Sequence, residues 1–436
     1  MNLDEVRKNV ILKEGTLYFD WTASALAYKP VENEMERVLK TYANTHSTTS
    51  KHAIRTNEYY ENSRAGLKDL LDLDDKFALI PCGFGATAAI KKFQEIMGIY
   101  ISPATREFLN LDIKSLENLP LVLVSPYEHH SNEISYRVGL CETVRIPLDT
   151  KGEVDFNALT EILAKNKGRK IIASFSVASN VTGVITDYKR LYLTIKAHGG
   201  IVALDATAAL PYMHVESGFY DAMFFSAHKF LGGVGGSGVL VIKKSLLASD
   251  EPTFAGGGVV RYVSRSEIAY KIDKEKLEEA GTPGILELIR TYLAVKLRND
   301  IGFEVIKEKE EELKAYFLEK LSQFDEITLY AKEVENKLPI FSFNVKGFDP
   351  YTFGSLLSER YNAETRSGCA CAGPYGHDLM GVDDGVDFVN EEKPGWVRVS
   401  LHYTHTKDDI DYLISAIKAV IKLRDKIKMT GGRHLC

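Results

Sequence analysis

Short apolar runs rich in β-branched residues alternate with longer amphipathic stretches along the chain. This alternation predicts a parallel sheet covered by helices, because buried parallel strands are apolar on both faces and are joined by crossover helices. The expected strands lie at 77–80, 121–124, 170–175, 201–204, 222–225 and 238–242. A glycine-rich or polar segment follows each strand. In open α/β sheets a ligand binds beyond the carboxyl ends of the strands, so these segments should converge on one site.

A different pattern follows Gly281-Thr282-Pro283-Gly284. The elements expected after it are, in chain order, helices at 285–297 and 304–324, a strand at 340–345, a loop at 366–374, a strand at 396–401 and a helix at 408–426. This order predicts a smaller α+β domain. We divide the chain into an N-terminal segment (1–14), a large domain (15–290) and a small C-terminal domain (291–436).

Composition is that of an ordinary soluble enzyme, with 436 residues, 45% of them hydrophobic and 26% charged, and a formal net charge of -6. The mildly acidic balance gives no electrostatic footprint for nucleic acid or an anionic membrane. The first eight residues lack the apolar core of a signal peptide, and no apolar run approaches the roughly 18 residues of a membrane span. We therefore expect a cytoplasmic protein.

The five cysteines are too few and too odd in number for a disulfide framework, so free or catalytic thiols are expected. Cys82 and Cys141 lie in apolar surroundings and are expected to be small core residues. Cys436 belongs to a short glycine-containing tail. Only Cys369 and Cys371 stand out as a pair.

Lys229 interrupts the apolar segment at 224–233, which reads Phe-Phe-Ser-Ala-His-Lys-Phe-Leu-Gly-Gly. An amine held at the end of an apolar strand has a lowered pKa and could form a Schiff base with an aldehyde cofactor. Ser226 and His228 beside it could bind a phosphate. The segment alone is equally compatible with a solvated surface lysine.

Polar residues at other strand ends complete a cofactor site. Backbone amides at 83–87, before a helix expected at 88–97, could cradle a phosphate. His129 could stack on an aromatic ring; the alternative for this His pair is a metal-binding or merely solvated site, although no third ligand of suitable spacing is evident. Asn180 follows another strand. Asp205 closes an apolar strand and needs a cationic partner, which the pyridinium nitrogen of pyridoxal phosphate would supply.

With these residues in view, the chain resembles the class V aminotransferase family of fold-type I pyridoxal-phosphate enzymes, in its cysteine desulfurase and selenocysteine lyase branch. The most specific segments are Glu128-His129-His130-Ser131-Asn132, Asp205 with Ser226-Ala227-His228-Lys229, Glu279-Ala280-Gly281-Thr282-Pro283, Arg366-Ser367-Gly368-Cys369-Ala370-Cys371-Ala372 and Val397-Arg398-Val399-Ser400. The resemblance implies an α/β fold with a mostly parallel seven-stranded sheet in the large domain.

The resemblance also implies a role for each site residue. Lys229 would form the Schiff base, Asp205 would pair with the ring nitrogen, His129 would stack on the ring and Asn180 would reach the phenolic oxygen. The phosphate positions match Gly85, Ala86, Thr87, Ser226 and His228, together with Thr282 from the partner subunit of a homodimer. Arg398 would bind the substrate carboxylate, for which a bidentate guanidinium is suited.

Cys371 matches the nucleophilic cysteine of the desulfurases. The implied reaction converts L-cysteine to L-alanine and leaves a persulfide on Cys371, from which a sulfur-acceptor protein could be served. No metal is implied. Two alternatives remain open: another reaction of the same scaffold, such as a carbon-sulfur or selenocysteine lyase or an aminotransferase, and a non-catalytic protein that keeps the fold. The presence of Lys229, Asp205, His129 and Arg398 together disfavours the last.

The chain departs from the family pattern in three places. Ala208 stands where the desulfurases carry a glutamine, and a water or another donor could replace that side chain. Cys369 lies two residues before Cys371, as either a packed residue or a second sulfur carrier. Gly85-Ala86 replaces a threonine pair. An insert at 101–119 carries no evident chemistry.

Overall fold

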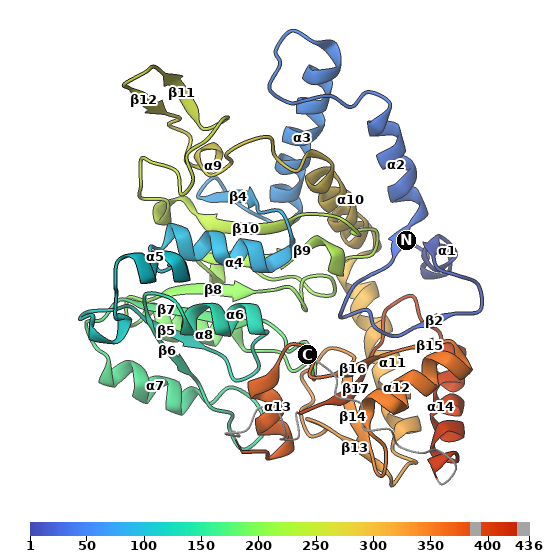
Figure 1. Cartoon of the computed structure of the whole chain (residues 1–436). Coiled ribbons are helices and arrows are strands. Elements are labelled where there is room, and N and C mark those ends of the chain that lie inside the picture. Colours follow the sequence, from blue (N-terminus) through green and yellow to red (C-terminus); the bar gives the residue numbers. More distant parts are fainter. Residues whose placement is uncertain (384–393, 425–436) are drawn as a thin grey trace.

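The computed structural model describes residues 1–383 and 394–424, arranged as a large sheet domain and a smaller domain beside it (Figure 1). The large domain is built on a seven-stranded sheet of order β4-β10-β9-β8-β7-β5-β6. Its strands are β4 (Phe77–Pro81), β5 (Leu121–Val124), β6 (Glu142–Arg145), β7 (Ile171–Ser176), β8 (Ile201–Asp205), β9 (Ala222–Ser226) and β10 (Gly238–Lys243). Only β10 runs antiparallel to its two neighbours.

The mostly parallel seven-stranded sheet is confirmed, and all six strands expected from the sequence are present. The strand that the sequence did not predict is β6. It lies at the sheet edge, and its residues Glu142, Thr143, Val144 and Arg145 are exposed or only partly buried. An edge strand needs no continuous apolar run, so the signal that located the central strands is missing there.

Helices cover both faces of the sheet. One face packs against α4 (Gly85–Ile96) and α6 (His130–Arg137), and the other against α7 (Phe156–Lys165), α8 (Tyr188–Lys196) and α10 (Ile285–Ile301). Neighbouring residues of one strand, such as Leu123 and Val124, contribute to the two different cores, as the two-residue period of a strand requires. Two further helices, α2 (Lys29–Leu39) and α3 (Lys51–Leu70), pack on α10.

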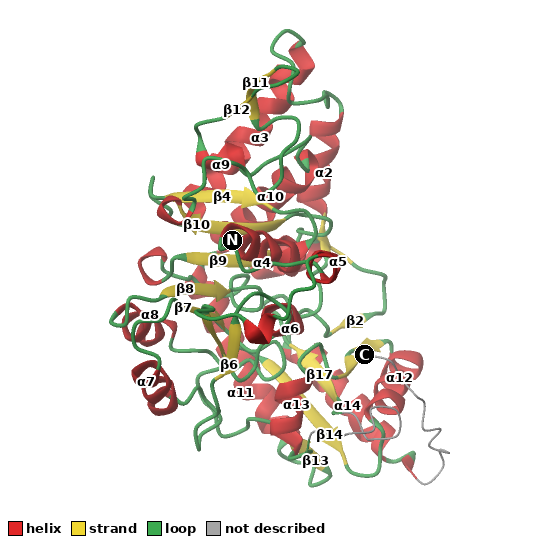
Figure 2. Ribbon diagram, turned by 60° about the vertical axis from the view of Figure 1, so that its left-hand side comes forward, coloured by secondary structure: helices red, strands yellow, loops and turns green. Residues whose placement is uncertain are grey.

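The smaller domain holds an antiparallel sheet of order β13-β14-β17-β16. Its elements are α11 (Phe303–Leu321), β13 (Ile327–Leu329), β14 (Ile340–Val345), α12 (Pro350–Tyr361), β15 (Ala363–Glu364), β16 (Arg366–Gly368), α13 (Gly373–Met380), β17 (Trp396–Ser400) and α14 (Lys407–Ile421). Figure 2 shows this sheet beside the lower end of the large one. The expected α+β character is therefore present.

Three details refine the expectations for this half. The segment 366–374 is not only a loop, because Arg366–Gly368 pairs with β17 and α13 begins at Gly373. The domain boundary between residues 290 and 291 stays a prediction; α10 crosses it without a break, and Ile301 still belongs to the core of the large domain. The C-terminal tail with Cys436 lies outside the described residues.

Residues 3–28 join the two domains. Helix α1 (Leu3–Lys8) is followed by β1 (Val10–Ile11), β2 (Leu17–Tyr18) and β3 (Ala27–Tyr28). Arg7 forms an ion pair with Asp409 of α14, and β2 pairs in parallel with β15. The chain then passes between the domains, and the Ala25 amide donates to the His228 carbonyl at 2.7 Å. Residues 20–25 are thereby held beside the carboxyl ends of the central strands.

Two excursions leave the large domain. The insert at 101–119 contains α5 (Pro103–Phe108) and a short 3-10 turn. A hairpin of β11 (Val260–Val263) and β12 (Ile268–Tyr270), followed by α9 (Lys274–Leu277), projects from the top of the molecule in Figure 1. Within residues 1–383 and 394–424, no helix combines the length and the apolar character that crossing a membrane requires.

Candidate functional site

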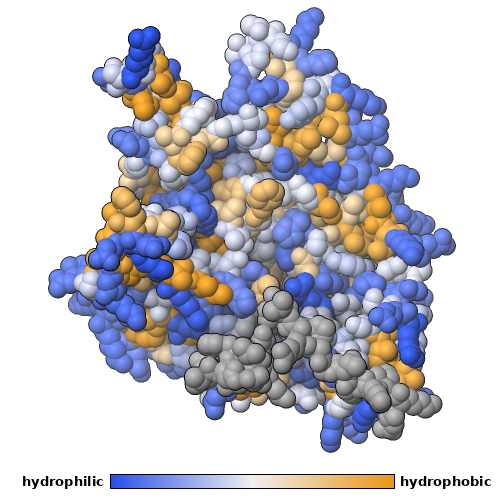
Figure 3. Space-filling model, in the orientation of Figure 1, coloured by the Kyte–Doolittle hydropathy of each residue, from blue (hydrophilic) through white to orange (hydrophobic). Residues whose placement is uncertain are grey.

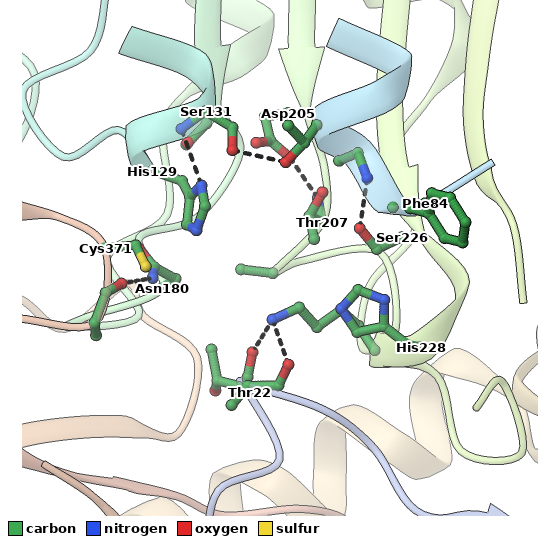
Figure 4. A pocket seen from close by; sticks show the side chains of 18 of the residues that line it. Thr22, Phe84, His129, Ser131, Asn180, Asp205, Thr207, Ser226, His228 and Cys371 are labelled. Atoms are coloured by element: carbon green, nitrogen blue, oxygen red, sulfur yellow. Dashed lines mark hydrogen bonds between the residues drawn. The ribbon is translucent and has the colours of Figure 1, made fainter. Parts of the chain in front are cut away.

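A cavity of about 570 Å³ opens at the carboxyl ends of the sheet strands, where residues 20–25 and the smaller domain meet the large domain (Figure 4). All but one of the residues predicted for the site line it: Gly85, Ala86, Thr87, His129, Asn180, Asp205, Ser226, His228, Lys229, Cys371 and Arg398. The exception is Thr282. These residues come from segments more than 300 positions apart, and the fold brings them to one place.

Lys229 lies in a 3-10 turn directly after β9 and extends its amine into the cavity. The amine donates hydrogen bonds to the carbonyl of Thr22 and, at 2.8 Å, to that of Ala23. Burial, followed by the positive charge of Arg398, lowers the pKa of Lys229 to about 7. A substantial fraction of the amine is therefore neutral near physiological pH, as a nucleophilic or basic lysine requires.

Asp205 ends β8 and is buried. It accepts a hydrogen bond from the Thr207 amide at 3.0 Å, and it forms no ion pair with any residue that the structure describes. Burial raises the pKa of its carboxyl group. A buried carboxylate without an ion-pair partner favours the binding of a cationic group inside the cavity.

His129 is the N-cap residue of α6, and its Nδ1 accepts a hydrogen bond from the Ser131 amide at 3.1 Å. Burial, followed by the charge of Lys229, lowers its pKa to about 4, so the imidazole is neutral. The neighbouring His130 ring lies 6.4 Å away between centroids, and no group of three potential metal ligands occurs among the described residues. The geometry favours a neutral ring that faces an aromatic ligand over a metal site.

The N-terminus of α4 forms an anion cradle. Gly85 adopts a φ of +65°, and a Cβ there would lie 3.1 Å from the Ser226 hydroxyl, so a side chain would be both strained and crowded. Ser226 accepts a hydrogen bond from the Ala86 amide at 2.7 Å. The Thr87 and Ser131 hydroxyls are 2.7 Å apart. Gly85 and Ala86 stand where the family pattern has a threonine pair, so they add no side-chain hydroxyl to this turn.

Arg398 projects from β17 and is only 2% exposed. Its guanidinium forms an ion pair with Asp20 at 2.7 Å and donates a second hydrogen bond to the Asn180 carbonyl at 2.8 Å. Its Nε has no protein partner within the described part of the chain. The group is held rigidly at the cavity wall with donor capacity to spare, which suits recognition of a carboxylate.

Cys371 lies in a tight turn before α13, with Ala370 and Cys371 both in the left-handed conformation at φ values of +50° and +57°. The Asn180 side-chain amide donates to the Ala370 carbonyl at 2.8 Å. Cys371 lines the cavity, whereas Cys369 is 6% exposed and packs in the core of the large domain. The structure separates the two thiols, with Cys371 facing the site.

Several wall residues were not singled out from the sequence. The carbonyls of Thr22 and Ala23 and the carboxylate of Asp20 have no motif of their own. Arg366 adds a second guanidinium, which has no ion-pair partner among the described residues. Glu287, from the first turn of α10, lines the wall beside Gly236. A search for charged residues within the motif segments would have found Arg366.

Thr282 and Ala208 illustrate two departures from a complete site. Thr282 is exposed and lies near Asn44, with 3.4 Å between the Asn44 Nδ2 and the Thr282 hydroxyl. Ala208 lines the cavity without offering a polar group where the family pattern has a glutamine. Another residue that lines the cavity could donate the hydrogen bond that the glutamine makes in the family pattern.

The donor set fits pyridoxal phosphate. The glycine cradle has space and amide donors for a phosphate, Asp205 would face a ring cation, and Lys229 supplies an amine with a lowered pKa. The Asn180 side-chain oxygen is buried and accepts no hydrogen bond from the part of the chain that the structure describes, so a polar group of a ligand could bind to it. The crowding at Gly85 decides the fit. A Cβ at this position would press on the Ser226 hydroxyl, so only glycine keeps the cradle open for a phosphate.

Similarity to known proteins agrees with this arrangement. Residues 17–413 match the profile of the family described as aminotransferase class-V. A probable cysteine desulfurase of Pyrococcus abyssi is 29% identical over 432 residues, covering 96% of this chain and 98% of the relative. A probable cysteine desulfurase of Staphylococcus aureus is 28% identical, and the match covers 92% of this chain and 91% of the relative.

Two solved structures share the fold. The apo structure of a cysteine desulfurase from Thermococcus onnurineus superposes with a TM-score of 0.80 at 25% identity, covering 97% of this chain and 99% of that one. A cysteine desulfurase from Escherichia coli gives a TM-score of 0.77 at 23% identity and covers 97% and 99%. The predicted pyridoxal-phosphate fold type I is confirmed, and the chain belongs to the class V aminotransferase family.

Proposed function

We propose that this protein is a pyridoxal-phosphate-dependent cysteine desulfurase: L-cysteine and the Cys371 thiol give L-alanine and a Cys371 persulfide. The observation that carries the proposal is the position of Cys371, which lines the same cavity as Lys229 and Arg398. The relatives named as probable cysteine desulfurases support it. The reaction balances in atoms and electrons: the carbon–sulfur bond of cysteine breaks, and a sulfur–sulfur bond forms on the enzyme.

Binding of the substrate carboxylate falls to the two guanidinium groups. Asp20 already neutralises Arg398 in part and fixes its orientation, while Arg366 adds a second positive charge to the wall. That charge attracts the carboxylate of an amino-acid substrate. The site therefore combines a rigid donor, Arg398, with a second guanidinium, Arg366, that no carboxylate of the described residues neutralises.

Proton transfer at the substrate falls to Lys229. Its pKa of about 7 gives it both protonation states near neutral pH, which is the condition for accepting a proton at one step and returning it at another. The carbonyls of Thr22 and Ala23 provide a place where the amine rests outside the substrate position. His129 stays neutral, so it adds no charge that would compete with this transfer.

The cofactor would be held by Lys229, Asp205, His129, Asn180 and the cradle at Gly85, Ala86, Thr87, Ser226 and His228. When bound, pyridoxal phosphate supplies an aldehyde that condenses with amino groups and a ring that accepts electrons from the α-carbon. Cys371 then supplies the nucleophile, as a thiolate directed at the substrate sulfur.

The proposal includes a homodimer in which Thr282 of one subunit completes the phosphate site of the other. The β11–β12 hairpin supports this, because it projects from the domain with Tyr262, Val263, Ile268 and Ile272 exposed. Figure 3 shows apolar side chains on this arm. A second subunit that packs against the arm would remove them from water. The double change Ile268→Asp and Ile272→Asp should give a monomer in sedimentation velocity and weaken cofactor retention.

The proposal further includes a cytoplasmic enzyme that passes persulfide sulfur to an acceptor protein. The test of the reaction is the yield of alanine and sulfide from L-cysteine with dithiothreitol. Equal yields that are lost in Cys371→Ala and kept in Cys369→Ala support the proposal, with Cys369→Ala as the matched control. Alanine at an unchanged rate in Cys371→Ala, or pyruvate and ammonia as products, would refute it in favour of a lyase.

A further inference from the structure

Two hydrogen bonds join the turn that carries Cys371 to His130, in the first turn of α6. One involves the His130 backbone and the other its side chain. The His130 backbone amide donates to the Cys371 carbonyl at 2.8 Å. The His130 Nε2 accepts a hydrogen bond from the Gly373 amide at 2.9 Å. Backbone and side chain of the same residue thus bracket the turn between residues 371 and 373.

The turn needs such support. Ala370 and Cys371 both have positive φ, a conformation that side chains with a Cβ rarely adopt and that persists only where the surroundings hold it. Asn180 holds the turn from the other side through the Ala370 carbonyl. Three anchors therefore fix a backbone that would otherwise relax.

The contact is also built for close approach. A Cβ at residue 373 would lie 3.2 Å from the His130 Nε2, so glycine at this position lets the amide reach the imidazole. The acceptor role requires a neutral ring protonated on Nδ1. His130 is half-buried, and burial lowers its pKa below the usual value, which keeps the ring neutral at physiological pH.

The preceding residue is His129, whose ring faces the cavity from the N-cap of the same helix. One helical turn therefore carries the ring that would stack on the cofactor and the ring that holds the thiol turn. We propose that His130 is a positioning residue that sets the place of the Cys371 sulfur relative to the cofactor ring. The proposal rests on the proposed role of Cys371 as nucleophile.

The test compares His130→Ala with His130→Gln in the purified holoenzyme. Glutamine can place an amide oxygen near the position of Nε2 and so restore the acceptor. We expect His130→Ala to lower kcat for alanine formation about tenfold or more with KM for cysteine within twofold, because displacement of a reacting atom slows the chemical step. The visible cofactor band should not change, and His130→Gln should recover most of kcat. His198→Ala, at an exposed histidine far from the turn, is the matched control.

Amide hydrogen exchange of the peptide that spans residues 369–380 gives a readout independent of turnover. It should speed up in His130→Ala and return toward the wild-type rate in His130→Gln. Gly373→Ala crowds the same contact from the other side and should lower kcat and speed exchange in the same way, which keeps the test valid if His130→Ala does not fold.

The outcomes separate the two proposals. Unchanged kcat and unchanged exchange in both His130→Ala and Gly373→Ala overturn the positioning role while the desulfurase reaction stands. A wild-type enzyme that makes no alanine, but whose exchange rates respond as described, overturns the proposed function while the structural clamp stands. A KM effect alone, with unchanged kcat, also counts against positioning of the nucleophile.

Discussion

Replacement of Lys229 by methionine tests the electrostatics of the site without any substrate. The cavity holds the amine with a pKa of about 7, lowered mainly by burial and next by Arg398. In the unfolded chain the same amine has a pKa of about 10.4. Between these two values the unfolded chain keeps a proton that the folded chain has released. Stability of the cofactor-free protein must therefore rise with pH in this window, and Lys229 contributes no pH dependence below it.

The magnitude follows from linkage. One proton per molecule gives a slope of at most about 1.4 kcal/mol per pH unit. Lys229 is partly exposed to the cavity, and water in the cavity screens its charge, so the full slope is an upper bound. From pH 7.5 to 9 we expect the wild type to gain roughly 1 to 2 kcal/mol relative to Lys229→Met.

The assay is urea unfolding of the cofactor-free wild type and of Lys229→Met at several values of pH between 6 and 9. Groups that titrate in both proteins cancel in the difference between the two curves. Lys167→Met is the control, since Lys167 is an exposed lysine. Parallel stability curves for wild type and Lys229→Met over this range would refute the lowered pKa and, with it, the description of Lys229 as a base near neutral pH.

Three further changes test other parts of the site. Asp205→Ala should weaken retention of pyridoxal phosphate roughly 10- to 100-fold by equilibrium dialysis, because a charge-assisted hydrogen bond contributes about 1.5–3 kcal/mol; unchanged affinity would exclude pairing with the ring nitrogen. Arg398→Lys should raise KM for cysteine by a similar factor, since a lysine cannot make the bidentate contact, with circular dichroism as the control for folding. Gly238→Ala would bring a Cβ to 2.0 Å from the Gly85 carbonyl oxygen; the strain, about 1–3 kcal/mol, should distort the phosphate cradle and lower both Tm and cofactor affinity.

Much of the fold could be predicted from the sequence because its central strands are buried on both faces. Strands such as β5, with four fully buried apolar residues, stand out in any reading of apolar runs. The edge strand β6 and the short strands β13 and β16 lack this signal, since part of each faces solvent or is polar. What fixes them is pairing with a neighbour, which depends on tertiary structure.

The candidate site divides in the same way. Side chains with distinctive chemistry at strand ends, such as Lys229 and Asp205, could be located from their segments. The ion pair between Asp20 and Arg398 joins residues 378 positions apart, and no local pattern predicts it. Cys369 and Cys371 could not be ranked from their spacing; the turn at positive φ separates them, with one in the core and the other in the cavity wall.

Thr22 contacts Lys229 through its backbone carbonyl, so its side chain can be changed without removing that contact. Its carbonyl accepts a hydrogen bond from Lys229, while its hydroxyl is buried without a partner among the described residues. Burial of an unpaired hydroxyl is unfavourable by about 1–3 kcal/mol. Thr22→Val keeps the shape and the carbonyl and removes only the hydroxyl. We therefore expect the cofactor-free variant to be at least as stable as the wild type in urea, by up to about 1 kcal/mol, with the pH dependence assigned to Lys229 unchanged. A loss of more than about 1 kcal/mol would show that the hydroxyl makes a bond that stabilises the folded state.

Asp20→Ala, in the same segment, should behave differently. It leaves the buried Arg398 guanidinium without its counter-ion and should lower the free energy of unfolding by about 3 kcal/mol or more. The two variants together would show that Asp20 acts through its side chain, whereas Thr22 acts through its backbone carbonyl.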